Sequence, residues 1–123
     1  MVVDDQASFR RAARTLIDAT PGFELVGDAD CGADALRHAD LLQPDLVLMD
    51  VYMPGMDGFE AARRLTEAHP ECVIVLVSME GLEGLDAAVA SSGASTIMRK
   101  ENLRPSSLRR LWASYGSPPP GDG

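Results

Sequence analysis

The chain has 123 residues, of which 46% are apolar and 24% charged, and it carries a net charge of −8. This length fits one globular domain and leaves no room for a second. The acidic balance argues against nucleic-acid binding by this chain alone, and no apolar run reaches the about 18 residues of a membrane-spanning helix. Two cysteines are too few for a disulfide scaffold and no signal peptide is visible, so we expect a cytoplasmic protein.

The first part of the chain alternates short apolar segments with helical ones. Residues 1–3 form an apolar run before two aspartates and predict a strand, and residues 9–17 carry apolar side chains at helical spacing. Residues 23–27 follow a Thr-Pro-Gly break and predict a second strand. A second helix is predicted over residues 33–43, because Pro44 prevents its continuation.

The middle of the chain contains an apolar run at residues 46–49, followed by Asp50. This run shows no alternation, which is typical of a parallel strand that is buried on both faces. Asp57 and Glu60 have the spacing of a capping box. They predict a third helix that begins at this point and continues to about Ala68.

The last third of the chain repeats the pattern. Residues 73–77 are the most strand-like segment, and a weak helix is predicted from about Leu82 to the residue before Gly93. A poorer fifth strand is predicted over residues 95–98, and Pro105 can occupy the first position of a final helix. The apolar face of that helix would consist of Leu108, Leu111, Trp112 and Tyr115.

Strict alternation of strands and helices predicts an α/β fold, with a doubly wound parallel sheet of five strands covered by five helices in three layers. Residues 1–116 would form this domain. Residues 117–123 are rich in proline and glycine and lack core-forming side chains, so we expect a tail or a truncated linker there.

Reactive side chains follow four of the five predicted strands. Asp4 and Asp5 follow the first strand, Asp50 the third, Ser78 the fourth and Lys100, which is the only lysine of the chain, the fifth. The carboxyl ends of parallel strands meet at one edge of a doubly wound sheet, where ligands bind. Three carboxylates placed together repel one another, and Mg²⁺, which prefers oxygen ligands and pairs with phosphate oxygens, would relieve that repulsion. A carboxylate beside Mg²⁺ can act as the nucleophile towards a phosphoryl group.

Four segments, VVDDQ, PDLVLMDVYMPGMDGFEA, VLVS and GASTIMRK, resemble the receiver domain of bacterial two-component response regulators. The resemblance extends over about residues 1–115 and is closest to the NarL/LuxR-type subfamily. It implies the flavodoxin-like strand order 2-1-3-4-5. It also implies that the domain is not itself an enzyme but a signalling domain, which takes part in its own phosphorylation and dephosphorylation.

The resemblance implies a role for each residue of the expected site. Asp50 would accept the phosphoryl group from a sensor histidine kinase. Asp5, Asp50 and the backbone carbonyl of Tyr52 would bind Mg²⁺, and Asp4 would act on the ion through water. Two further residues would contact the phosphoryl group, namely Ser78 and Lys100.

The resemblance further implies that the domain regulates transcription through a DNA-binding domain that this chain lacks. A homodimer would form through the face of the fourth helix, fifth strand and fifth helix, or through the first and fifth helices. Several positions depart from the family, and two of them bear on its mechanism: Ile97 replaces the usual aromatic residue, and Met79 replaces a small one. They favour an alternative, a pseudo-receiver that acts as an interaction module without phosphorylation. A Mg²⁺-dependent phosphatase with an aspartyl nucleophile is a further alternative, but the chain is too short to supply its cap.

Overall fold

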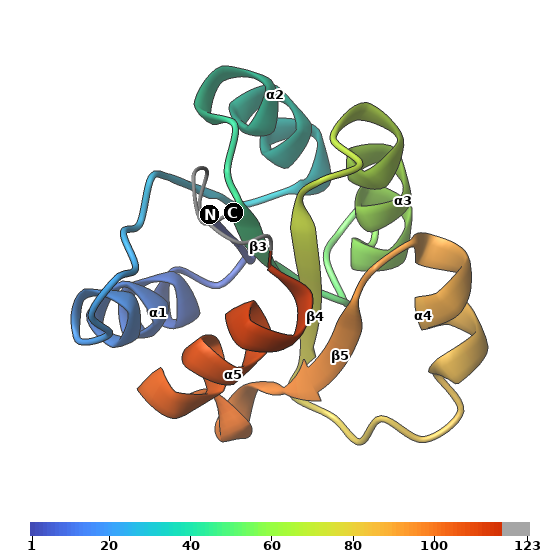
Figure 1. The fold of residues 1–123 in the computed structure, drawn as a ribbon. Helices are drawn as coiled ribbons and strands as arrows, with labels where there is room; N and C mark the ends of the chain where they lie inside the picture. Colours follow the sequence, from blue (N-terminus) through green and yellow to red (C-terminus); the bar gives the residue numbers. More distant parts are fainter. Residues whose placement is uncertain (117–123) are drawn as a thin grey trace, which may run out of the picture.

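The computed structural model describes residues 1–116. These residues form one parallel sheet of five strands in the order β2-β1-β3-β4-β5, as predicted (Figure 1). Strands β3 and β4 lie at the centre, and β2 and β5 form the edges. The strands are β1 (Val2–Val3), β2 (Asp28–Ala29), β3 (Leu46–Asp50), β4 (Val73–Ser78) and β5 (Thr96–Arg99).

Five α-helices cover the two faces of the sheet, and a short 3₁₀ helix follows β5. Helices α1 and α5 lie on one face, and α2, α3 and α4 on the other (Figure 1). The helices are α1 (Ala7–Asp18), α2 (Gly32–Leu42), α3 (Gly58–Ala68), α4 (Asp86–Ser92), η1 (Lys100–Asn102) and α5 (Pro105–Tyr115). The predicted three-layer α/β architecture is therefore confirmed.

The core consists of two apolar clusters, one on each face of the sheet. All six residues of β4 are buried, as are the last four of β3, which explains why both segments lack polar alternation in the sequence. Burial of each large side chain stabilises the fold by about 1.5–3 kcal/mol. On the α1/α5 face, the cluster of buried residues comprises Val2, Ala13, Ile17, Leu48, Val73, Val75, Val77 and Leu108.

The strand register brings the carboxyl ends of β1, β3, β4 and β5 to one edge of the sheet. Val3 pairs with Met49, so the residues that follow them, Asp4 and Asp50, are neighbours. Asp50 in turn pairs with Val77. At the next pair of strands, Ser78 pairs with Arg99, the residue that precedes Lys100.

The prediction of a strand over residues 23–27 is wrong. The second strand is Asp28–Ala29, and it is held beside β1 by pairing of Val2 with Asp28 and of Val3 with Ala29. Val26 is 41% exposed, whereas Phe23 and Leu25 pack against the α1/α5 cluster. Phe23 and Leu25 therefore belong to the core on this face of the molecule, although their segment is not a strand of the sheet.

The fourth helix also begins later than the predicted position at Leu82. Gly84 has a φ of +77°, which lies outside the helical region, so the chain turns there and α4 begins only at Asp86. Three other predicted boundaries are confirmed: Asp57 caps α3 by accepting a hydrogen bond from the Glu60 amide, Gly93 ends α4 in the left-handed region, and Pro105 begins α5. The proposed tail at residues 117–123 lies outside the described residues.

Candidate phosphoryl and metal site

Three carboxylates meet at the carboxyl edge of the sheet. Asp4 and Asp5 follow β1, and Asp50 ends β3. Each offers an oxygen within 4.8 Å of the other two. Asp4 and Asp50 are buried, whereas Asp5 is exposed. The prediction that these three aspartates lie together is confirmed, and the exposed Asp5 forms the solvent side of the cluster.

Lys100 supplies the positive charge of this cluster. It is the first residue of η1, and burial leaves it only 8% exposed. Its Nζ lies 2.5 Å from Oδ2 of Asp4 and 3.4 Å from Oδ1 of Asp50. This ammonium contacts two carboxylates of the three-aspartate cluster, so the carboxylates outnumber the positive charge beside them.

This charge excess perturbs the ionisation of Asp50. Burial, and secondly the negative charge of Asp4, raise the pKa of Asp50 to about 6, and Lys100 offsets only part of this effect. A carboxylate that is difficult to ionise next to a second carboxylate would gain from a bound cation. The electrostatics of the site thus favour an additional positive ligand.

Asp4 is held in place by the backbone and side chains around it. Its Oδ1 accepts a hydrogen bond from the Gln6 amide at 2.8 Å, and its own amide donates to the Ala29 carbonyl at 3.0 Å. Arg10 of α1 donates to the Asp4 carbonyl oxygen at 2.7 Å. These contacts fix both the carboxylate and the start of α1 relative to the end of β1.

The sequence did not predict the contact between Phe9 and Lys100. The Lys100 Nζ lies 4.4 Å from the centroid of the Phe9 ring, within the range of a cation–π interaction. The helical spacing of Phe9 indicates only that it faces the core. Its proximity to the lysine depends on how α1 lies over the ends of β1 and β5, which no local pattern in the sequence encodes.

Gly58 allows α3 to approach the end of β3 closely. A Cβ at this position would lie 2.1 Å from the Asp50 carbonyl oxygen and 2.8 Å from the Cα of Val51. The Gly58 amide donates to the Val51 carbonyl at 2.8 Å. The first turn of α3 therefore packs directly against the backbone that carries Asp50, and any larger residue would displace it.

Ser78 and Tyr52 lie at or just after the ends of the two central strands. Ser78 is fully buried at the end of β4, and its Oγ accepts a hydrogen bond from the Glu80 amide at 3.1 Å. Tyr52 follows β3 by two residues, and its side chain is exposed. Met79, next to Ser78, is 67% exposed and therefore lies at the surface.

Comparison with known families agrees with this geometry. The family model described as the response regulator receiver domain matches residues 1–111. The chain belongs to this family. Receiver domains are phosphoacceptor signalling modules of two-component systems, so the family implies a cognate histidine kinase. The Asp4, Asp5 and Asp50 cluster is typical of the Mg²⁺ site of a receiver.

The receiver shares part of its sequence with several curated proteins. Response regulator GacA of Pseudomonas aeruginosa is 48% identical over 65 residues, which are 53% of this chain and 30% of that protein. A protein-glutamate methylesterase/protein-glutamine glutaminase of Alkalilimnicola ehrlichii is 43% identical over 65 residues, 53% of this chain and 17% of that protein. The matched part thus spans less than a third of either relative.

Solved receiver structures cover nearly the whole chain. The signal receiver domain of NarL from Mycobacterium tuberculosis superposes with a TM-score of 0.84 and 26% identity, covering 95% of this chain and 94% of that one. The response regulator domain of CheB from Thermotoga maritima gives 0.82 and 26%, covering 96% of each. A LuxR-family response regulator from an Aurantimonas species gives 0.82 and 29%, covering 93% of this chain and 81% of that one. These neighbours support the receiver family but do not favour one subfamily.

The donor set of this receiver fits a hard divalent cation. Its ligand atoms are carboxylate oxygens, which Mg²⁺ prefers, and their combined charge exceeds that of Lys100. Oδ2 of Asp4 is buried and has no aligned hydrogen bond within residues 1–116, although it lies beside the ammonium. The chemistry of the donors and the raised pKa of Asp50 both agree with a metal at this edge.

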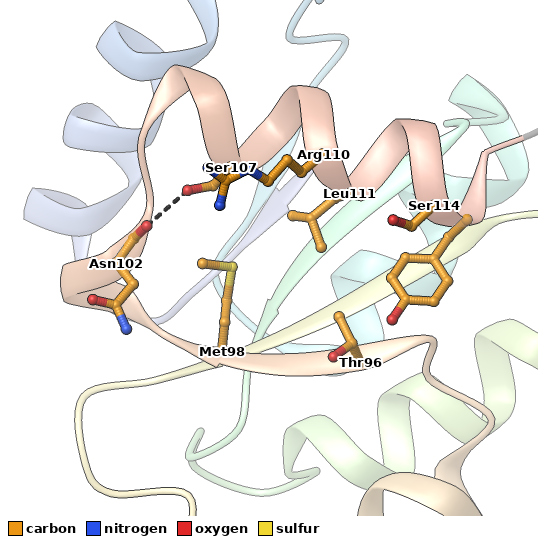
Figure 2. Close-up of a pocket in the computed structure, with 8 residues that line it drawn as sticks. Thr96, Met98, Asn102, Ser107, Arg110, Leu111 and Ser114 are labelled. Carbon is orange, nitrogen blue, oxygen red and sulfur yellow. Dashed lines mark hydrogen bonds between the residues drawn. The ribbon is translucent and has the colours of Figure 1, made fainter.

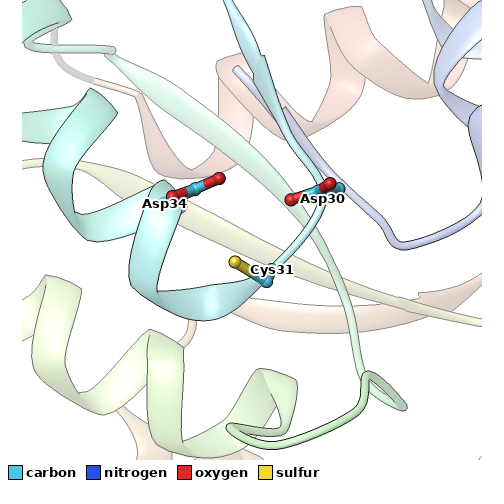
Figure 3. A group of neighbouring side chains, drawn as sticks. All are labelled: Asp30, Cys31 and Asp34. Carbon is cyan, nitrogen blue, oxygen red and sulfur yellow. The ribbon is translucent and has the colours of Figure 1, made fainter.

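A second group of side chains lies between the end of β2 and the start of α2. Asp30, Cys31 and Asp34 offer oxygen and sulfur atoms within 4.8 Å of one another (Figure 3). Asp30 is exposed, and Asp34 forms an ion pair with Arg37 on the next turn of the helix. This ion pair lowers the pKa of Asp34, so its carboxylate already has a cationic partner.

The receiver also has an open groove between β5 and α5, with a volume of about 340 Å³ (Figure 2). Met98 and Leu111 form its apolar part, and Thr96, Ser107 and Ser114 contribute hydroxyls. The Ser107 Oγ donates to the Asn102 carbonyl at 2.8 Å, at one end of the groove (Figure 2).

Within residues 1–116, no helix is long and apolar enough to cross a membrane.

Proposed function

We propose that this receiver accepts a phosphoryl group on Asp50 from a sensor histidine kinase. The observation that carries the proposal is the position of Asp50, a buried carboxylate at the end of β3 that faces Asp4 and the ammonium of Lys100. An Asp50 oxygen would attack the phosphorus of a phosphohistidine. A P–O bond then forms, the P–N bond breaks, and the histidine nitrogen leaves with the electron pair and takes up a proton.

We propose that Asp5, Asp50 and the carbonyl of Tyr52 bind Mg²⁺, with Asp4 acting through water. Both oxygens of Asp4 already face partners, the Gln6 amide and Lys100. Asp5, by contrast, is exposed and forms no ion pair with the residues that the structure describes. This difference supports Asp5 as the direct ligand. When bound, Mg²⁺ would neutralise phosphoryl oxygens and lower the energy of the charged transition state.

Lys100 and Ser78 would bind the transferred group. In the present structure Lys100 is 3.4 Å from Asp50 Oδ1, so a small movement of its flexible side chain would bring the ammonium to a phosphoryl oxygen. The Ser78 hydroxyl accepts a hydrogen bond from the Glu80 amide, and rotation of its side chain would allow it to donate to the phosphoryl group instead.

The proposal extends to the subfamily, the location, the output and the dimer interface of this receiver. We propose that the domain belongs to the NarL/LuxR-type subfamily, that it acts in the cytoplasm, and that it regulates transcription through a DNA-binding domain outside this chain. The β5–α5 groove lies on one of the two faces that we propose for homodimer formation. A pseudo-receiver without phosphorylation is the alternative that Ile97 and Met79 favour.

Treatment with acetyl phosphate tests the proposal. The protein should gain the mass of one phosphoryl group with Mg²⁺ and little without it, as measured by intact mass spectrometry. The modified protein should lose that mass on treatment with hydroxylamine, because an acyl phosphate is cleaved by this nucleophile. A protein that gains no mass at any Mg²⁺ concentration, although it is folded, would favour the pseudo-receiver.

A further inference from the structure

The ring of Phe9 forms one wall of the Lys100 side-chain site. Phe9 lies in the first turn of α1, is half-buried and packs against the α1/α5 core cluster. The Lys100 ammonium lies 4.4 Å from the centroid of this ring. Its two other close partners are both carboxylates, Asp4 at 2.5 Å and Asp50 at 3.4 Å.

This arrangement restricts a side chain that is intrinsically flexible. A lysine ammonium on four methylene groups has many rotamers, and fixing it at one position costs entropy. The face of an aromatic ring attracts a cation, and the attraction is stronger where water is excluded. Because Lys100 is buried, the Phe9 ring stabilises the ammonium at the carboxyl edge of the sheet.

We propose that Phe9 is a positioning residue, whose ring holds the Lys100 ammonium beside Asp50 and thereby speeds phosphoryl transfer. This inference rests on the proposed function of Asp50. The ring accepts no conventional hydrogen bond, so it stabilises the ammonium without competing with a phosphoryl oxygen for the N–H donors. Lys100 can then exchange Asp4 for the phosphoryl group while the ring contact persists.

The position of the ring is fixed independently of the lysine. Arg10, the next residue on α1, donates to the Asp4 carbonyl oxygen at 2.7 Å, and its Nε lies 3.6 Å from Oδ2 of Asp28. These contacts attach the start of α1 to the ends of β1 and β2. Phe9 is therefore presented to the site by a rigid element, as the positioning of a reactive group requires.

A single-lysine NMR experiment tests the contact. Because the chain contains one lysine, protein labelled with ¹³C-lysine gives one set of Cε resonances. In the wild type, the ring current of Phe9 should shift the Cε protons upfield. Phe9→Leu should abolish this shift and Phe9→Tyr should retain it. The control Phe23→Leu removes a ring that packs on the same core cluster, and it should leave the lysine signal unchanged.

The rate of phosphorylation by acetyl phosphate in the presence of Mg²⁺ tests whether the Phe9 ring speeds phosphoryl transfer to Asp50. Phe9→Leu should slow the reaction about two- to fivefold, whereas Phe9→Tyr and Phe23→Leu should stay close to wild type. If Phe9→Leu fails to fold, as judged by its amide spectrum, Phe9→Met is a second variant without a ring. Unchanged lysine resonances, or a changed resonance with an unchanged rate, would overturn the inference. If the wild type gains no phosphoryl group, the proposed function fails, and the lysine resonance still shows whether the ring holds the ammonium.

Discussion

The ammonium nitrogen of Lys100 lies 2.5 Å from Oδ2 of Asp4, a side chain that is fully buried. The shorter contact of the lysine is thus with Asp4, whereas Asp50 is 3.4 Å away. Lys100 therefore offsets only part of the burial and of the repulsion by Asp4, and the pKa of Asp50 remains raised. In the unphosphorylated site, the negative charge of Asp50 is therefore only partly balanced by Lys100, and a bound cation would complete the balance.

We expect Asp50→Asn to abolish phosphorylation by acetyl phosphate while leaving the fold intact. The amide has the shape of the carboxylate but lacks its nucleophilic charge. Intact mass after acetyl phosphate treatment measures the loss. Asp57→Asn is the matched control, because asparagine also caps helices and the Asp57 side chain accepts the Glu60 amide at 2.9 Å. A wild-type yield in Asp50→Asn would place the phosphoacceptor elsewhere.

The Mg²⁺-free protein should become less stable as the pH rises through about 6. Burial and the charge of Asp4 raise the pKa of Asp50 from its ordinary value of 3.8 to about 6 in the folded protein. Protonated Asp50 therefore stabilises the fold fully below about pH 4, and this contribution is lost as the pH rises through about 6. A difference of this size between the folded and unfolded pKa corresponds to a loss of at most about 3 kcal/mol. Urea unfolding at pH 4 to 8 in EDTA measures it. The pH dependence should be weaker in Asp50→Asn, and identical slopes would contradict the assignment.

Mg²⁺ should stabilise the folded protein, and Asp5→Ala should remove most of this effect. A ligand at ten times its dissociation constant adds about 1.4 kcal/mol to the free energy of unfolding. Thermal unfolding with and without Mg²⁺ measures the shift. Asp18→Ala is the control, because it removes an exposed aspartate at the last residue of α1, the end of that helix farther from Asp5. An equal Mg²⁺ effect in Asp5→Ala and wild type would assign the ligand role to another residue.

The sequence predicted the central strands better than the edges of the sheet. Strands β3 and β4 are buried on both faces, and such burial requires the continuous apolar runs that are visible in the sequence. Strand β2 has two residues, one of them Asp28, and this is too short for any pattern. The sequence predicts a strand at the apolar segment 23–27 instead, because packing on the core and pairing in a sheet favour the same residue types.

The site followed from sheet topology, whereas its supporting contacts did not. Asp4, Asp50, Ser78 and Lys100 could be placed together because each comes at the end of a predicted parallel strand. The contact of Phe9 with the lysine depends on the placement of a helix over the sheet, which propensity and periodicity do not specify. Sequence patterns therefore located the reactive groups but not what orients them.

Gly58→Ala should destabilise the domain by about 1–3 kcal/mol or more, as overpacking does. The new Cβ would lie 2.1 Å from the Asp50 carbonyl oxygen, so α3 or the end of β3 must move. Urea unfolding measures the loss, and the rate of phosphorylation should fall with it. Gly81→Ala is the control, since a Cβ there meets no atom within 4 Å. A neutral Gly58→Ala variant would show that α3 can shift without cost.

Phosphorylation should change the loop after β4 more than the last helix. Ile97 stands where the resembling receivers carry an aromatic residue, and it pairs with Leu76 while packing on the core cluster beside α3. A β-branched side chain has few rotamers, so it cannot change its orientation between the unphosphorylated and the phosphorylated state as an aromatic ring does. Gly81 and Gly84, in contrast, lie between β4 and α4, and Gly84 already adopts a φ of +77°. This loop can therefore rearrange at low cost.

Amide chemical shifts with and without beryllofluoride, a mimic of the phosphoryl group, test this prediction. We expect the changes to concentrate at residues 78–86, with small changes at 103–115. Ser78 and Lys100 supply the differential affinity that any shift between two states requires, whatever residue occupies position 97. Ile97→Tyr is the matched variant, because a ring restored at this position should extend the changes into α5. Chemical-shift changes along α5 in the wild type that are as large as those at residues 78–86 would contradict the prediction, because α5 would then respond to phosphorylation without a ring at position 97.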